Sequence, residues 1–368
     1  MLNRVETVIV GGGQTGLMAG YYLAKQGRPF VILDANERVG DAWRNRWDSL
    51  RLFTPAIFSH LPGVKLDMPN WSFATKDELA DYFEAYAERF ELPVRNGVEV
   101  DGLTKAGGRF AVSAGGDTYE AENVIVATGA HNIPKRPAFA GELDPRIVQM
   151  HSAEYKNPSQ LAAGDVLLVG AGNSGAELAI DLRGTHRVLL SGEIKGELPV
   201  PHGTFRARIG FRVFRFLGHR VIKRSNRFGR KMGPKLIEKG DPLIRTRSKE
   251  LEAAGIERLP RVAGIQDGRP LLEDGRVLDV ANVIWCTGFT TDFGWIDLPI
   301  FDEAGEPMHD RGVVESAPGL YFLGLIFLYA FSSDVLPGRG RDAKHVVKHL
   351  MARQKQEGMS PAPALAHA

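Results

Sequence analysis

The sequence predicts an α/β protein of two Rossmann-like three-layer domains, the second inserted in the first. A glycine-rich turn follows an apolar run twice, at 11–16 and at 170–175. Each turn leads into a helical pattern and a second apolar run, which is the order of a βαβ unit. Each unit is followed by a later run that ends in Thr-Gly, at 123–129 and 282–288. The 368 residues are enough for two ordinary domains.

The first unit lies at the N-terminus, where apolar runs at 8–10 and 30–33 flank a helical pattern at 17–26. Continuous Val, Ile and Leu runs are typical of parallel strands that are buried on both faces. The turn between them has the spacing of a dinucleotide-binding fingerprint.

In that fingerprint, Gly11 permits the tight turn, Gly13 lets a pyrophosphate approach the backbone, and Gly16 lets the helix pack on the strand. The helix N-terminus then offers free N–H groups to the phosphates. Asp34 ends the second strand, where an acid accepts hydrogen bonds from ribose hydroxyls. The residues predicted to form this site are Gly11, Gly13, Gln14, Thr15, Gly16, Asp34 and Ala35.

The second unit repeats this order, with Ser191 at the position of Asp34. An acid there would repel a 2′-phosphate and a serine tolerates it, so NADPH is favoured and NADH stays possible. Either Lys195 or Arg187 could hold the phosphate, whereas Glu193 opposes it. The residues predicted to form this second site are Gly170, Gly172, Asn173, Ser174, Gly175, Ser191 and Lys195.

Charge is unevenly distributed along the chain. Residues 203–249, the basic segment, contain fifteen Lys or Arg and two acids, a net +13 against −11 for the rest. Phe211, Phe214, Leu217 and Val221 recur at helical spacing among the arginines, which predicts a basic amphipathic helix. Three interpretations stay open: a solvated cap over the cofactor domain that attracts anionic NAD(P)H, contact with an anionic membrane or a lipophilic substrate supply, or nucleic-acid binding. The last is disfavoured because no recognised nucleic-acid-binding fold accompanies the charge.

The cysteine content and the N-terminus predict a cytoplasmic protein. The single cysteine, Cys286, excludes an internal disulfide, a CxxC redox pair and a thiolate metal cage. The N-terminus has no signal-peptide layout, and no stretch reaches the roughly 18 apolar residues of a membrane span. We also expect no metal site and no Ser/His/Asp triad.

Several motifs of the sequence resemble those of a known protein family. The chain resembles the flavin-containing monooxygenases, in particular the bacterial flavoprotein monooxygenase-like group related to plant YUCCA enzymes. The resemblance covers almost the full length. It rests on the motifs at 11–16, 40–44, 47–55, 127–129, 170–175 and 287–289.

The resemblance implies FAD at the first turn and NADP at the second, in FAD/NAD(P)-binding domains at 1–157 with 285–368 and at 158–284, the basic segment included in the latter. The segment around Trp43 and Arg51 would lie along the flavin, and the Thr-Gly elements would cross between domains. Further FAD contacts implied by the resemblance are Gly40, Trp43, Arg44, Arg51, Thr54, Ala127, Thr128, Gly129, Gly324, Arg341 and Asp342, and further NAD(P) contacts are Thr287 and Gly288.

Three residues are candidates for catalysis: Phe53, at the place of an Asn that supports the flavin in some members, its neighbour Thr54, and His151. His151 is alternatively a hinge residue hydrogen-bonded between the domains. Phe327, Tyr329 and Phe331 would share one face if extended, and would then wall a substrate pocket or pack in the core. The turn at 337–342 is expected to lead into a last helix at 341–355, whose N-terminus faces the flavin.

The function implied is an FAD-dependent, NAD(P)H-consuming monooxygenase. It would insert one oxygen of O2 into a small lipophilic amine, sulfide or ketone through a flavin C4a-peroxide. One alternative is an NAD(P)H–flavin reductase or oxidase that passes electrons to a quinone, a protein or O2; the single cysteine excludes a dithiol version. Another is a non-catalytic, nucleotide-sensing flavoprotein that docks on a membrane partner. Monomer and homodimer both stay open.

Overall fold

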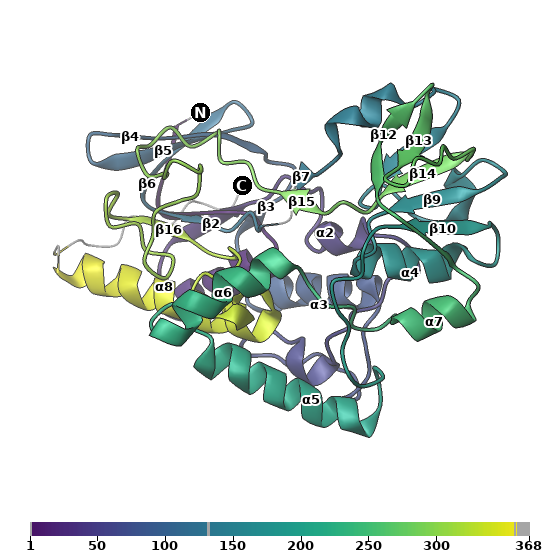
Figure 1. Cartoon of the computed structure of the whole chain (residues 1–368). Coiled ribbons are helices and arrows are strands. Elements are labelled where there is room, and N and C mark those ends of the chain that lie inside the picture. Colours follow the sequence, from purple (N-terminus) through teal and green to yellow (C-terminus); the bar gives the residue numbers. More distant parts are fainter. Residues whose placement is uncertain (1, 131–132, 357, 359–368) are drawn as a thin grey trace.

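The computed structural model describes residues 2–130, 133–356 and 358. These residues form two lobes, each built on its own sheet, with a two-stranded crossover between them (Figure 1). Each glycine turn joins a parallel strand to a helix, so the predicted α/β class with two Rossmann-like units is confirmed.

The first lobe is centred on a seven-stranded sheet of order β3-β2-β1-β6-β5-β4, in which β16 also pairs with β6. β1 pairs in parallel with both β2 and β6, and residues 5–10 of β1 are buried. Burial on both faces explains why this run is continuously apolar. The strands are β1 (Leu2–Val10), β2 (Phe30–Leu33), β3 (Val94–Arg95), β4 (Val100–Ala106), β5 (Arg109–Ala114), β6 (Asp117–Val126) and β16 (Leu320–Phe322).

The second lobe is centred on a five-stranded parallel sheet of order β11-β10-β9-β14-β8. The strands are β8 (Val148–His151), β9 (Val166–Val169), β10 (Val188–Ser191), β11 (Glu257–Leu259) and β14 (Asn282–Trp285). A hairpin of β12 (Val262–Gln266) and β13 (Arg269–Leu272) lies beside this sheet. β8 precedes residue 157, which the sequence placed at the end of the first domain; the domain boundaries themselves stay a prediction.

Helices cover both sheets. α1 packs on β1 and β2 and against α8, and α4 packs on β9 and β10. The helices are α1 (Gln14–Ala24), α2 (Asp41–Arg44), α3 (Lys76–Arg89), α4 (Asn173–Leu182), α5 (Phe205–Phe216), α6 (Arg227–Lys239), α7 (Ser248–Ala253) and α8 (Leu336–Gln356), and the short helical turns are η1 (Ala56–Phe58), η2 (Ala138–Glu142), η3 (Pro158–Gln160), η4 (Leu217–Val221) and η5 (Phe331–Asp334). Within the described part of the chain, none of the helices combines the length and the apolar character that crossing a bilayer requires.

The two Thr-Gly elements lead into the crossover between the lobes. β7 (Ile133–Pro134) and β15 (Phe289–Thr290) pair antiparallel. The Lys135 amide donates to the Gly288 carbonyl over 3.0 Å, and the Thr287 hydroxyl donates to the Lys135 carbonyl. The chain segments that leave the two sheets are therefore fastened to each other.

The two helices of the basic segment lie on the first lobe, whereas the end of the segment returns to the second lobe, where Leu243 is buried in the core beneath β9 and β10. The segment leaves the second sheet after β10, and in Figure 1 its helix α5 runs along the lower edge of the molecule with α6 above it. Lys223 forms an antiparallel bridge with Ala330, and the Phe331 amide donates to the Ile222 carbonyl over 3.0 Å. A segment that starts from the sheet of the second lobe thus covers part of the first lobe.

The region before the last helix differs from expectation. α8 begins at Leu336, so residues 337–342 are helical and not a turn. Phe327, Tyr329 and Phe331 do not form an extended stretch: Phe327 has a positive φ of 52°, and Phe331 begins η5. The condition for a shared aromatic face is therefore not met.

Candidate functional site

The first glycine turn has no room for side chains at Gly11 and Gly16, where the backbone packs closely, and has open space at Gly13, where a phosphate would approach. Gly11 has φ +106°, and a Cβ there would lie 2.7 Å from the Ala127 carbonyl oxygen. A Cβ on Gly16 would overlap the Gly11 carbonyl oxygen. Gly13, by contrast, has φ −70° and no neighbour within 4 Å of its Cβ position, and no side chain caps α1 there. An uncapped helix start with open space beside it is what an anion site requires.

Asp34 is held at the edge of this turn. Its carboxylate is buried and accepts hydrogen bonds from the Gly12 amide over 2.6 Å and from the Asn36 amide over 2.8 Å. The exposed Ala35 follows directly. The position fits a ribose contact, because the carboxylate is fixed beside the phosphate-facing backbone.

Two other strand ends converge on the same turn. The Ala127 amide donates to the Val10 carbonyl over 2.8 Å, which places residues 127–129 next to Gly11. A Cβ on Gly324, after β16, would lie 3.4 Å from the Thr15 hydroxyl and 3.6 Å from the Gly129 Cα. Residues 127–129 and Gly324, which lie far apart in the sequence, therefore meet the start of α1.

Trp43 reaches the same place, whereas Arg44 does not. The Trp43 indole N–H donates to the Gln14 side chain over 3.1 Å and so ties α2 to the start of α1. Arg44 instead forms ion pairs with Asp41, Asp81 and Glu84. Its guanidinium stabilises the packing of α2 on α3. We therefore leave Arg44 out of the proposed FAD contacts.

Arg341 and Asp342 are also used within the chain. Arg341 donates to Asp342 over 2.9 Å, and the buried Asp342 accepts from the Ser333 hydroxyl over 2.6 Å. Arg341 also lies 3.2 Å from His219 in η4. These contacts fasten the basic segment to η5 and α8, which the sequence did not predict.

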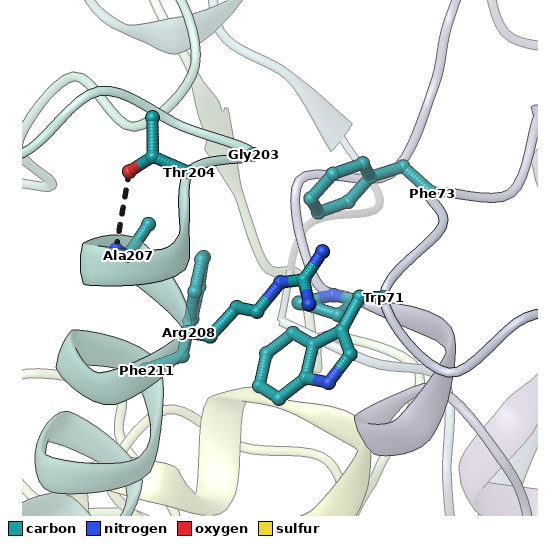
Figure 2. A pocket seen from close by; sticks show the side chains of 8 residues that line it. Trp71, Phe73, Gly203, Thr204, Ala207, Arg208 and Phe211 are labelled. Carbon is teal, nitrogen blue, oxygen red and sulfur yellow. Dashed lines mark hydrogen bonds between the residues drawn. The ribbon is translucent and has the colours of Figure 1, made fainter.

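Phe53 and Thr54 lie in a loop that the basic segment covers. Phe53 is 37% exposed, and its carbonyl accepts a hydrogen bond from the His202 ring over 2.8 Å. Next to this loop is a narrow crevice in which Arg208 extends from α5 over Trp71 (Figure 2), with 5.4 Å between guanidinium and ring. Arg51, before this loop, is exposed and donates to the Phe73 carbonyl over 3.3 Å.

The second glycine turn has the same geometry as the first. Gly170 has φ +114°, and a Cβ there would overlap the Cys286 carbonyl oxygen. Gly172 has φ −80°, caps α4 without a side-chain bond, and has nothing within 4 Å of its Cβ position. The half-buried Ser174 and the buried Gly175 complete the first turn of α4. Asn173 instead holds the loop after α6, because its side-chain NH2 donates to the Pro242 carbonyl over 3.0 Å and its side-chain oxygen accepts from the Ile244 amide over 2.9 Å.

The cations beside Ser191 differ from those expected. Ser191 is buried and donates to the Pro260 carbonyl over 2.7 Å, and Arg187 is paired with Asp165 and Glu257. Lys195 is exposed.

Sequence reasoning missed two arginines at this edge. Arg258 donates to the Gly192 carbonyl over 3.2 Å, and Arg261 pairs with Glu193 over 3.1 Å. They follow Ser191 by more than sixty residues and reach it because β11 pairs with β10. Only a correct strand order could have found them.

His151 fastens the second sheet to the crossover. The buried ring donates from Nε2 to the Gly288 carbonyl over 3.0 Å and accepts the Ala153 amide at Nδ1 over 3.1 Å. Phe289 packs edge-on against it at 5.0 Å. Both nitrogens are thus used by a neutral imidazole, and burial lowers the pKa of His151. The arrangement favours the hinge interpretation over a catalytic one.

We expect His151 to make the protein less stable in acid. Burial lowers the pKa of His151 in the folded protein. The contribution of neutral His151 to the free energy of unfolding is therefore complete above the unfolded pKa of about 6.5, and it is lost as the pH falls below that value. One such group adds a slope of up to about 1.4 kcal/mol per pH unit. Urea unfolding of His151→Gln, which keeps a donor for Gly288, should show a flatter pH dependence than the wild type.

The control for this measurement is His186→Gln, at the surface turn after α4. This variant should keep the wild-type slope. Equal slopes in the wild type and in His151→Gln would contradict the role of His151.

Comparisons with known proteins agree with this geometry. A family model described as Pyridine nucleotide-disulphide oxidoreductase matches residues 8–193. The Uncharacterized oxidoreductase CzcO-like of Geobacillus kaustophilus is 39% identical over 354 residues, which cover 95% of this chain and 99% of that protein. Indole-3-pyruvate monooxygenase YUCCA1 of Oryza sativa subsp. japonica is 36% identical over 179 residues, or 48% of this chain and 44% of that protein.

A solved structure is similar over nearly the whole length. The flavin-containing monooxygenase from Stenotrophomonas maltophilia has a TM-score of 0.74 at 27% identity, with 95% of this chain and 99% of that chain covered. The fold is that of two-domain FAD/NAD(P)-binding flavoproteins. The chain matches the pyridine nucleotide-disulphide oxidoreductase family, belongs to the flavin monooxygenase family and is a flavin-dependent oxidoreductase. The predicted family is thereby confirmed.

Proposed function

We propose that the protein is a cytoplasmic, FAD-dependent and NAD(P)H-consuming monooxygenase that transfers one oxygen atom of O2 to a small lipophilic amine, sulfide or ketone. One observation carries the proposal. Two uncapped helix starts, at Gly13 and Gly172, lie beside the residues that precede the two Thr-Gly elements. Those elements lead into one crossover, β7 with β15, so two dinucleotides bound there would share a junction.

The residues present fit the two cofactors. The space above Gly13 and above Gly172 is what a pyrophosphate needs, and both helix starts offer unbonded N–H groups. When bound, FAD accepts hydride from NAD(P)H and activates O2.

In this proposal the residues of the chain bind the cofactor, orient it and shield it from water. The start of α1 would hold the FAD pyrophosphate and Asp34 would orient its ribose. The hydrogen bond to Gln14 fixes Trp43 beside the start of α1. Trp71 and Phe73 cover the loop that carries Phe53. Such a cover excludes water from the reacting atoms, which such a reaction needs more than an acid or base.

The nucleotide preference follows from the cations at the end of β10. We assign the 2′-phosphate of NADPH to Arg258 and Arg261, which lie beside Gly192 and Glu193. Arg261 also offsets the charge of Glu193, which would otherwise repel a phosphate.

An Arg258→Gln/Arg261→Gln variant should bind NADP⁺ roughly ten- to hundredfold more weakly, since a charge-assisted hydrogen bond contributes about 1.5–3 kcal/mol. Its Kd for NAD⁺, which has no 2′-phosphate, should stay unchanged. Isothermal titration with both nucleotides measures the difference without turnover. Arg187→Gln, whose arginine is already paired with Asp165 and Glu257, is the matched control. An equal loss of both nucleotides would refute the assignment.

Oxygen transfer is tested by stoichiometry. Purified holoenzyme is supplied with NADPH, ¹⁸O2 and panels of lipophilic amines, sulfides and ketones. The proposal requires at least one panel member to gain a single ¹⁸O atom, with NADPH consumed in step and little H2O2 released. If all NADPH oxidation appears as H2O2 or as reduced quinone, the protein is the reductase or oxidase alternative. If NADPH leaves the flavin oxidised, it is the nucleotide-sensing alternative.

A further inference from the structure

The basic segment exposes an apolar ridge. Of the twelve large hydrophobic side chains that are exposed among the described residues, seven lie between Phe205 and Phe228. Monomeric soluble proteins rarely gather exposed apolar residues in this way unless the surface binds something. The seven are Phe205, Ile209, Val213, Phe214, Phe216, Leu217 and Phe228.

Four of these side chains form one outward stripe of α5. Phe205, Ile209, Val213 and Phe216 are 71%, 50%, 52% and 61% exposed. At 3.6 residues per turn they fall within an arc of about 80°. The buried Ala207 points the opposite way, toward the protein. The helix is therefore apolar on the side that none of the described elements covers, along the lower edge of the molecule in Figure 1.

The inward side of α5 is already occupied. Phe211 lies in the crevice with Trp71 and Phe73 (Figure 2), and Phe214 packs edge-on against Phe331 at 5.8 Å. Phe211 and Phe214 are the first two residues of the apolar pattern found in the sequence, so that pattern marks the inward side of α5. The outer ridge is a second apolar face, which core packing does not explain.

Positive charge surrounds the ridge. The 35 residues at 203–237 contain eleven Lys or Arg and no acid. On the helix, the exposed Arg206 flanks one side of the ridge. Arg212 flanks the other side, where it is exposed and also stacks over the Trp71 ring at 5.1 Å. An exposed apolar stripe flanked by arginines is typical of a helix that lies in a membrane interface.

We propose that α5 docks the protein on an anionic lipid surface, with the ridge in the acyl boundary and the flanking arginines among the head groups. Charge complementarity selects this occupant. A second copy meeting the ridge by two-fold symmetry would bring the same arginines face to face. A nucleic acid would satisfy the arginines but leave four apolar side chains without a partner.

The docking does not depend on the proposed monooxygenase activity. Docking would supply that activity with substrate, because lipophilic substrates concentrate in the bilayer next to the protein. The ridge lies outside the glycine turns and the crossover, so substitutions there should leave flavin content unchanged.

Vesicle co-sedimentation tests the proposal with the full-length holoprotein. The probe is phosphatidylcholine vesicles with and without phosphatidylglycerol, at low and at high salt. We expect binding to the anionic vesicles, release at high salt, and little binding to phosphatidylcholine alone. Equal binding to both kinds of vesicle, or binding to neither, would overturn the proposal, as would binding of an oligonucleotide in place of vesicles.

Two variants separate the ridge from the charge. Phe205→Ser/Phe216→Ser should weaken vesicle partitioning on the order of tenfold or more, because two exposed rings no longer enter the acyl region. Arg206→Gln/Arg220→Gln, which replaces one exposed arginine of α5 and one of the following turn η4, should weaken vesicle partitioning about fivefold per arginine. The matched control, Leu2→Ser/Met308→Ser, removes two apolar residues of similar exposure outside the segment and should bind as the wild type does.

A third variant reports the contact directly and keeps the ridge apolar. The fluorescence of Ile209→Trp should shift to shorter wavelength when anionic vesicles are added, beyond any change in the wild type. An unchanged spectrum, wild-type binding by the ridge variant, or ridge-dependent dimers in sedimentation velocity with no vesicle binding would each refute docking through α5.

Discussion

A Gly13→Leu variant should purify as a folded protein without yellow colour. Gly13 has φ −70° and open space at its Cβ position, so a leucine meets no backbone and costs the start of α1 about 1 kcal/mol as a poorer cap. The leucine side chain then fills the space that the FAD pyrophosphate would occupy. Loss of two charge-assisted hydrogen bonds, at about 1.5–3 kcal/mol each, raises the Kd for FAD roughly 10²- to 10⁴-fold.

Flavin absorbance of the purified variant and a titration with added FAD measure this effect, and circular dichroism checks the fold. Gly184→Leu, at a turn with equal space but away from both helix starts, is the control and should stay yellow. Gly11 and Gly16 are unsuitable, because a side chain there overlaps the backbone and would unfold the turn. Full flavin content in Gly13→Leu would show that FAD does not bind at this turn.

A Gly172→Leu variant should keep its flavin and lose its reduction by NADPH. Gly172 matches Gly13 in backbone conformation and open space, so the two substitutions cost their helices the same. The leucine blocks the start of α4 and should slow anaerobic flavin reduction by about a hundredfold or more at subsaturating NADPH. Dithionite, which needs no binding site, should still bleach the flavin.

Each of these glycine variants is the control for the other. Loss of flavin from Gly172→Leu with retention in Gly13→Leu would reverse the two assignments. Normal reduction of Gly172→Leu by NADPH would remove the nicotinamide from the second turn altogether.

The glycine turns could be predicted because their chemistry is local. Residues 11–16 and 170–175 must close a turn, admit a phosphate and pack a helix on a strand, and all three demands act within a few residues. The apolar runs around them are continuous because parallel strands are covered on both faces. The family and the fold class followed from these motifs and are confirmed.

Several side chains could not be placed from sequence, because long-range contacts use them. Arg44 carries a cation next to a predicted flavin segment, but three carboxylates on α2 and α3 bind it. Arg258 and Arg261 reach the end of β10 only through the pairing with β11. Pro337 and Gly338 resemble a turn, yet the first turn of a helix tolerates proline because its N–H has no partner there, and α8 begins before them.

By itself the sequence determined two βαβ units with their glycine turns, the flavin monooxygenase family and a segment of strong positive charge. These follow from patterns whose physical causes act over neighbouring residues. Only the tertiary structure decided that the basic segment crosses to the first lobe, that His151 fastens the crossover, and that α5 turns a second apolar face outward. Which face of an amphipathic helix is buried depends on what packs against it, and here Phe331 and Trp71 occupy one side and leave Phe205 and Phe216 on the other.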